Sequence, residues 1–213
     1  MAQLHFFKLK PAHLPWLKCI IHLSALVPLL LTFFQAFNDE LGGDPVSALL
    51  HFTGSGAFKL LLLSLLVTPL ARLLKQGLLI NVRRLLGLYS FTYALAHIAS
   101  YVLFDLQLDW PLLLSEIVKR PYITVGFVGW LILLALALTS TKQAQRKLGK
   151  RWQSLHNSVY LAAILVSIHF LWSVKSAILE PTIYIVMTAL LLAYRRDKFK
   201  RWFNKRIKNR QRT

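Results

Sequence analysis

The sequence predicts an all-α membrane protein, a bundle of six transmembrane helices with both termini in the cytoplasm. Composition is the first reason, because 56% of the 213 residues are hydrophobic and only 16% are charged, which is too apolar for a soluble domain of this length. The second reason is that the apolar residues are gathered in six long runs. The third is that basic residues gather at alternate ends of those runs, as they do in multi-pass proteins of the bacterial inner membrane.

Each predicted span is an apolar run of about 20 residues, the length that a helix needs to cross roughly 30 Å of hydrocarbon. The runs lie near residues 16–37, 47–74, 84–104, 122–140, 153–173 and 178–194. The first run follows Lys8 and Lys10, as in a signal peptide, but it is too long and lacks a following cleavage site, so we expect it to be retained. We assign residues 1–195 to one membrane domain and 196–213 to a basic cytoplasmic tail.

The distribution of charge predicts the orientation. With the N-terminus inside, the inner segments hold 22 of the 26 lysines and arginines, whereas the outer segments hold seven of the eight acidic residues. Because basic residues stay on the cytoplasmic side, both termini are expected there. The net charge of +18 therefore marks topology, and no nucleic-acid partner is expected. The sequence shows no internal repeat, and its single cysteine, Cys19, excludes an intramolecular disulfide and a cysteine-ligated cluster.

Five histidines lie within the predicted spans, namely His22, His51, His97, His156 and His169. An ionisable group inside a bilayer is costly, so its default interpretation is functional. At about 1.5 Å of rise per residue, His97 and His169 lie level with each other near the outer face. Two neutral imidazoles that face each other across a bundle can bind haem iron from both sides, which leaves the iron to carry electrons. The alternative is that each histidine only hydrogen-bonds a neighbouring helix.

The neighbours of the two outer histidines suit a haem pocket. Their aromatic neighbours in the sequence would supply the walls, namely Tyr93, Tyr101, Phe104, Phe170 and Trp172. Ser100, Ser167 and Ser173 are candidates to accept hydrogen bonds from the ring N–H groups.

The inner half of the bundle carries a different set of residues. His156 lies about 20 Å along the axis from His169, yet the two cannot share one face of an ideal helix. Arg83 and Arg84 stand where a second ligand on the third span would be needed, and arginine does not bind iron. The pair is either an ordinary anchor at a cytoplasmic helix end or a clamp for a phosphate, such as that of flavin mononucleotide (FMN). Five further donors would surround such a flavin, namely Lys150, Arg151, Gln153, Ser154 and Asn157.

Several strings of residues resemble one family of bacterial membrane proteins. They are RRLLGLYSFTYALAHIASY (83–101), KRPYITVGFVGW (119–130), LALTSTKQAQRKLGKRWQSLHNSVYL (136–161) and IHFLWSVK (168–175), with HFTG at 51–54 and TPLAR at 68–72. Over nearly the whole chain they resemble the MsrQ family, formerly YedZ. MsrQ proteins are haem-binding membrane subunits with a ferric reductase-like transmembrane domain, which the resemblance assigns to residues 1–195.

The resemblance implies a function and a set of site residues. The haem b ligands would be His97 and His169, while His156 would be a second cofactor ligand or a flavin-side residue, and FMN would bind at Arg83 and Arg84. Electrons would come from the quinone pool or a cytoplasmic flavin reductase. They would pass to MsrP, a periplasmic molybdopterin enzyme that repairs methionine sulfoxide, in a heterodimer at the bacterial inner membrane. Reduction would occur in that partner, so no catalytic residue is expected here.

Two other functions compete with this one. A stand-alone ferric reductase would carry a cytoplasmic FAD and nicotinamide domain, for which the 19 residues after Tyr194 are too few, and a b561-like cytochrome is a related alternative. A non-redox transporter would use the histidines as proton relays or as contacts between helices, and it would be colourless.

Overall fold

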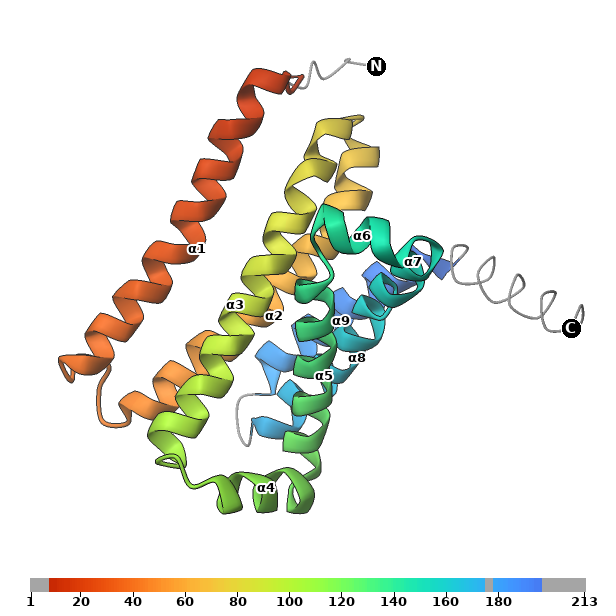
Figure 1. Ribbon diagram of the computed structural model, residues 1–213. Helices are drawn as coiled ribbons and strands as arrows, with labels where there is room; N and C mark the ends of the chain where they lie inside the picture. Colours follow the sequence, from red (N-terminus) through yellow and green to blue (C-terminus); the bar gives the residue numbers. More distant parts are fainter. Residues whose placement is uncertain (1–7, 175–177, 197–213) are drawn as a thin grey trace, which may run out of the picture.

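The computed structural model describes residues 8–174 and 178–196, and within these ranges the chain forms helices and no strand (Figure 1). The long helices are α1 (Leu14–Phe37), α2 (Pro45–Leu73), α3 (Arg83–Ser100), α5 (Pro121–Leu138), α8 (Val159–Ser173) and α9 (Leu179–Ala193). The shorter helices are α4 (Trp110–Lys119), α6 (Lys142–Leu148) and α7 (Lys150–His156). Turns of 3-10 helix cover Pro11–His13 and Gly77–Val82, and a π-helical turn, Tyr101–Asp105, extends α3. The all-α prediction is confirmed for the described residues.

Five of the predicted spans are confirmed as helical segments long and apolar enough to cross a membrane. They are Pro11–Phe37, Pro45–Leu73, Gly77–Asp105, Pro121–Leu138 and Lys150–Ser173. The sixth predicted span, 178–194, corresponds to α9, a shorter apolar helix of 15 residues. At 1.5 Å per residue α9 extends about 22 Å, which is less than the roughly 30 Å of a hydrocarbon core. The predicted tail, 196–213, lies outside the described residues except for its first residue.

Proline and an acidic cap begin the helices that follow two of the loops. α2 begins at Pro45, and the carboxylate of Asp44 accepts a hydrogen bond of 2.9 Å from the backbone N–H of Ser47. In the same way Asp109 accepts a bond of 2.8 Å from Leu112 at the start of α4. A proline is tolerated in a first helical turn because its missing N–H would have no partner there. These caps therefore fix where α2 and α4 begin.

The fifth predicted span is interrupted in its inner part. Asn157 and Ser158 separate α7 from α8, and the Ser158 hydroxyl donates to the carbonyl of Leu155 at 2.6 Å. Local bonds of this kind compete with continued helix formation. The interruption places His156 and His169 on different helices. The ideal-helix argument that separated their faces therefore does not apply to this segment.

α2 lies at the centre of the bundle and contacts α1, α3, α8 and α9 (Figure 1). Its side chains Phe58, Leu61 and Leu65 are each 1% exposed. Ala162 and Ala163 of α8 are fully buried in the same cluster. Small residues let neighbouring helix backbones approach closely, which is how helices pack where lipid supplies no hydrophobic driving force.

Hydrogen bonds also join the helices. The hydroxyl of Tyr93 in α3 donates to the carbonyl of Ala25 in α1 at 2.7 Å, and the Ser90 hydroxyl donates to the Ala57 carbonyl of α2 at 2.9 Å. Both donors are buried. These two bonds join α3 to α1 and to α2, the long helices that precede it in the sequence.

α4 lies across the ends of α3 and α5, at the bottom of Figure 1, rather than along the bundle. Leu113 and Ile117 face a cavity between the long helices, whereas Leu114 and Val118 are 66% and 82% exposed. A short helix that is apolar on two faces and lies across the span ends is typical of a segment at the membrane–water interface.

We expect Tyr93→Phe to lower the free energy of unfolding in detergent by about 1 kcal/mol, because the Ala25 carbonyl loses its partner on α3. The measurement is the thermal midpoint of the purified protein. Tyr194→Phe is the control, since Tyr194 is 51% exposed. Equal midpoints for the two variants would contradict a role for this bond in joining α1 to α3.

Candidate cofactor sites

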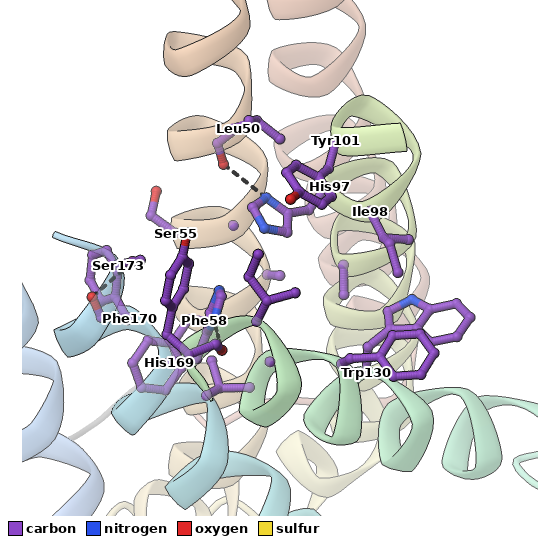
Figure 2. A pocket seen from close by; sticks show the side chains of 18 of the residues that line it. Leu50, Ser55, Phe58, His97, Ile98, Tyr101, Trp130, His169, Phe170 and Ser173 are labelled. Atoms are coloured by element: carbon purple, nitrogen blue, oxygen red, sulfur yellow. Dashed lines mark hydrogen bonds between the residues drawn. The ribbon is translucent and has the colours of Figure 1, made fainter. Parts of the chain in front are cut away.

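The structure brings together the two histidines that sequence analysis placed at equal depth. His97 extends from α3 and His169 from α8, and their ring centroids are 6.3 Å apart with the ring planes at 78° (Figure 2). The bond from a metal to an imidazole nitrogen is about 2 Å long. Two rings that bind one metal from opposite sides therefore stand with their centroids on the order of 6 Å apart. The observed separation matches this requirement.

The hydrogen bonds of the two rings define which nitrogen is available. His97 Nδ1 lies 3.0 Å from the carbonyl oxygen of Leu50, and His169 Nδ1 lies 2.7 Å from that of Tyr122. A carbonyl only accepts, so each Nδ1 carries the proton and each Nε2 keeps a free lone pair. Both rings are thus held as neutral ligands that bind through Nε2.

The serines expected to accept these ring bonds do not do so, and that prediction is wrong. Ser167 donates to the carbonyl of Ala163 at 2.7 Å, and Ser173 donates to that of Phe170 at 2.9 Å. The Ser100 hydroxyl is buried without a hydrogen-bond partner among the described residues. Hydroxyls on a helix satisfy themselves on their own backbone one turn away, whereas the carbonyls that reach the rings come from neighbouring helices.

A glycine backs each ring. A Cβ atom built on Gly54 of α2 would lie 3.0 Å from Cε1 of His97, and one built on Gly126 of α5 would lie 2.6 Å from Nδ1 of His169. Any larger residue would therefore displace the ring. The absence of a side chain at these two positions lets each imidazole lie against the backbone of the adjacent helix.

The rings face a cavity of about 400 Å³ with a mainly apolar lining (Figure 2). Its walls include the aromatic side chains of Phe58, Phe127, Trp130 and Phe170. Of the five aromatic residues expected here from the sequence, Tyr101 and Phe170 line it, whereas Tyr93, Phe104 and Trp172 are not part of its lining. A cavity of this size and character is suited to a small planar cofactor.

We call this space the outer cavity, after the side of the membrane on which the sequence predicts it. Its residues fit a haem better than they fit a bare metal ion. Within residues 8–174 and 178–196, no group of three or more His, Cys, Asp or Glu side chains is placed to hold a metal. A bare transition metal usually takes three or four protein ligands, whereas haem iron needs only the two axial ones. Two neutral imidazoles in an apolar cavity supply that pair.

A polar network closes the outer end of the cavity, and sequence analysis missed it. Glu116 of α4 binds Arg120 at 2.6 Å and accepts a hydrogen bond from the Tyr101 hydroxyl at 3.3 Å. Arg120 in turn donates to the Tyr122 hydroxyl at 3.3 Å. Because the carbonyl of Tyr122 also holds His169, the network connects α4 to a ring of the candidate site. The i,i+4 spacing of Glu116 and Arg120 is the sequence signal that could have revealed it.

A second cavity, also about 400 Å³, lies in the other half of the bundle. It is lined by all three residues assigned to the inner site, Arg83, Arg84 and His156. Of the five further donors expected around a flavin, Gln153 and Asn157 add amide groups to the lining, whereas Lys150, Arg151 and Ser154 are not part of it. The structure therefore gathers guanidinium, imidazole and amide donors around one space, a set of groups that suits an anionic ligand such as a phosphate ester.

His156 is held in this inner cavity by two contacts. Its ring stacks on Trp152 with centroids 3.9 Å apart, and its Nε2 lies 3.1 Å from the Thr139 hydroxyl. The Trp152 indole N–H donates to the Thr139 carbonyl at 2.9 Å. No second imidazole lines the cavity, so the described residues offer no histidine pair there. This donor set fits a flavin better than a second haem with two axial histidines.

Arg195 was counted from the sequence only as a topology residue, but it is 7% exposed and packs into the bundle. Its guanidinium donates to the Tyr160 hydroxyl and, at 2.7 Å, to the Leu65 carbonyl. Tyr160 lines the inner cavity. A basic residue after the last helix gave no sign of this burial, because it matches the pattern of an ordinary cytoplasmic anchor.

The remaining intramembrane histidines contact other helices. His22 Nδ1 lies 2.5 Å from the Tyr89 hydroxyl, which joins α1 to α3. His51 Nε2 lies 3.3 Å from a carboxylate oxygen of Glu180 and lines the outer cavity. For His22, the interpretation that an intramembrane histidine hydrogen-bonds a neighbouring helix is confirmed.

The fold and its two cavities define a polytopic helical protein of the ferric reductase-like class. Residues 53–167 match the family described as ferric reductase like transmembrane component. This match includes Arg83, Arg84, His97 and His156, whereas His169 lies just beyond its end.

The chain belongs to the MsrQ family. It is 53% identical over 197 residues to the protein-methionine-sulfoxide reductase heme-binding subunit MsrQ of Cronobacter sakazakii, covering 92% of this chain and 98% of that protein. It is 52% identical to proteins of the same name from Salmonella paratyphi B and Salmonella heidelberg, covering 92% of this chain and 99% of each. No solved structure gave a significant match. The resemblance seen in the sequence strings is confirmed.

Proposed function

We propose that this protein is a membrane electron-transfer subunit that binds haem b between His97 and His169 and FMN beside Arg83 and Arg84. It passes electrons from a cytoplasmic flavin reductase or the quinone pool to MsrP, a periplasmic molybdopterin reductase of methionine sulfoxide. The observation that carries the proposal is the pair of neutral imidazoles, 6.3 Å apart, whose Nε2 atoms are both free. The relatives named above are heme-binding subunits, which supports the assignment.

The residues of the outer site have defined roles. Bound haem would supply a centre that accepts and releases one electron at a time. His97 and His169 would fill both axial positions, and their Nδ1–H bonds keep the rings neutral and oriented. The two histidines would therefore leave no position at the iron for a substrate to bind. The outer site is therefore suited to transfer of electrons rather than to bond chemistry.

The residues of the inner site would bind FMN. Bound flavin would exchange electrons in pairs with a donor and singly with the haem. Arg83 and Arg84 carry fixed positive charge and forked donors that suit a phosphate. The stacked pair of Trp152 and His156 lines the same cavity and offers an aromatic face for a flavin ring.

The two cavities adjoin each other. Leu61 and Leu133 line both of them, so one layer of side chains separates the inner site from the outer one. These leucines are buried, at 1% and 5% exposed, so an apolar layer lies between the two sites. In this proposal, electrons would cross that layer.

The proposed partner explains why such a path is needed. Reduction of methionine sulfoxide takes two electrons and restores oxidised proteins. In this proposal α9 completes six spans, both termini are cytoplasmic, residues 1–195 form the membrane domain and 196–213 the basic tail. The protein then lies in the inner membrane with its histidine pair near the periplasm. A stand-alone ferric reductase or a non-redox transporter would need no such partner.

We predict that the purified protein shows a low-spin haem spectrum, with a Soret band and a sharp α-band on reduction with dithionite. His97→Ala or His169→Ala should lower the haem content about tenfold or more, or leave it high-spin, since one axial ligand is lost. Absorption spectra and a pyridine haemochrome assay measure this. His22→Ala is the control, because His22 contacts Tyr89. A colourless wild-type protein after haem-replete expression would exclude the proposal.

We predict that replacing Arg83 and Arg84 together with glutamine releases flavin and leaves haem in place. Losing two charge-assisted bonds to a phosphate should cost about 3 kcal/mol, or roughly a hundredfold in FMN affinity. Fluorescence of extracted flavin and titration with FMN measure the change. Replacing Lys150 and Arg151 with glutamine removes the same charge nearby and should keep the flavin, because neither residue lines the cavity. Equal flavin retention in both variants would contradict the proposal that Arg83 and Arg84 bind the FMN phosphate.

We predict that reporter fusions place the loop at Gly42 in the periplasm and the C-terminus in the cytoplasm. Alkaline phosphatase, which is active only in the periplasm, should be active at Gly42 and inactive at the C-terminus. Green fluorescent protein should give the opposite pattern. An active phosphatase at the C-terminus would show that α9 does not cross the membrane.

A further inference from the structure

Although the sequence shows no internal repeat, the outer site is built from one arrangement used twice. In the first copy Leu50 and Gly54 of α2 contact His97 of α3. In the second copy Tyr122 and Gly126 of α5 contact His169 of α8. The carbonyl and the histidine are 47 residues apart in both copies, and the glycine follows the carbonyl by one helical turn in both.

Each copy confines its ring on three sides. The carbonyl holds Nδ1, the glycine lies beneath the ring, and the opposite histidine faces it across the cavity. A Cβ on Gly54 would be 3.0 Å from Cε1 and 3.1 Å from Nδ1 of His97. A Cβ on Gly126 would be 2.6, 2.8 and 2.9 Å from Nδ1, Cε1 and Cγ of His169. The second ring is therefore held more tightly than the first.

The atoms that a Cβ at either glycine would contact belong to a histidine ring and not to the far end of a flexible side chain. An imidazole ring is rigid, and a ring fixed at Nδ1 by a hydrogen bond can only tilt or move away from the glycine. Movement away from the glycine shifts the whole ring, including Nε2, relative to the histidine 6.3 Å away. A methyl group at either glycine would thus change the direction in which Nε2 points.

We propose that Gly54 and Gly126 are positioning residues that set the orientation of the two ligand rings toward one shared haem iron. The inference rests on the proposed haem site. It adds to that site the two residues that fix the orientation of its histidine rings. Each glycine acts through the histidine that it contacts, and both glycines also line the outer cavity. The spectrum and reduction potential of the haem should depend on both glycines, and more strongly on Gly126.

A merely structural role for these glycines predicts something different. A glycine needed only for close helix packing would lower the thermal midpoint when replaced, but it would leave the haem spectrum unchanged in the protein that remains folded. Two other glycines supply matched controls. Gly129 lies one turn from Gly126 on α5 and would contact Val166 at 3.3 Å, while Gly87 on α3 has no atom within 4 Å of its Cβ position.

The test compares the full-length haem-loaded wild type with Gly54→Ala, Gly126→Ala, Gly129→Ala and Gly87→Ala. The readouts are the low-spin signal in electron paramagnetic resonance, the midpoint potential and the haem affinity, each measured alongside the thermal midpoint. We expect Gly126→Ala to reduce haem affinity about 10- to 100-fold, as loss of a ligand-orienting contact does. Gly54→Ala should shift the low-spin signal and the potential by less, and the two controls should match the wild type.

Each outcome decides the question. Spectra, potentials and affinities of Gly54→Ala and Gly126→Ala that equal those of the controls would overturn the inference while leaving the haem site intact. A wild type without haem would instead exclude the proposed function itself. If Gly126→Ala does not accumulate, Gly54→Ala decides alone, because its contact of 3.0 Å is the milder one.

Discussion

The geometry of the outer site depends on one kind of interaction, the hydrogen bond from the imidazole of His97 or His169 to a carbonyl of the neighbouring helix. A polar N–H in the apolar interior of a membrane protein must have a partner. Leu50 and Tyr122 provide it, although their carbonyls belong to helices, because a carbonyl oxygen has two lone pairs. Each bond joins a helix pair, α2 with α3 or α5 with α8, and the same bond turns Nε2 toward the cavity. Packing and ligand chemistry are therefore set together.

The bundle is divided into two cavities of different chemistry. The outer cavity holds two neutral rings among aromatic walls, whereas the inner one gathers arginine, histidine and amide groups. Leu61 and Leu133 form the layer between them. The interruption at Asn157 and Ser158 contributes to this division, since it lets α7 present His156 to the inner cavity independently of α8. The fifth predicted span thus supplies one histidine to each cavity.

Much of this arrangement could be predicted from residue type and spacing. Five spans followed from apolar length, and the apposition of His97 and His169 followed from their equal depth. The contacts that orient the rings could not be predicted, because they depend on which faces of separate helices meet. The serines were the wrong choice for this reason, and Gly54 and Gly126 were seen only as parts of strings. The burial of Arg195 also escaped prediction, since its position resembles a topology anchor.

Helix α4 affects how closely a partner protein could approach the outer cavity. Leu113 and Ile117 cover the mouth of the outer cavity, and Glu116 fastens that cover to Arg120 and Tyr101. A redox partner that docks from this side would be kept about one helix diameter, on the order of 10 Å, from the cavity. Under the proposed function, an electron leaving the outer site on this side would therefore have to cross α4.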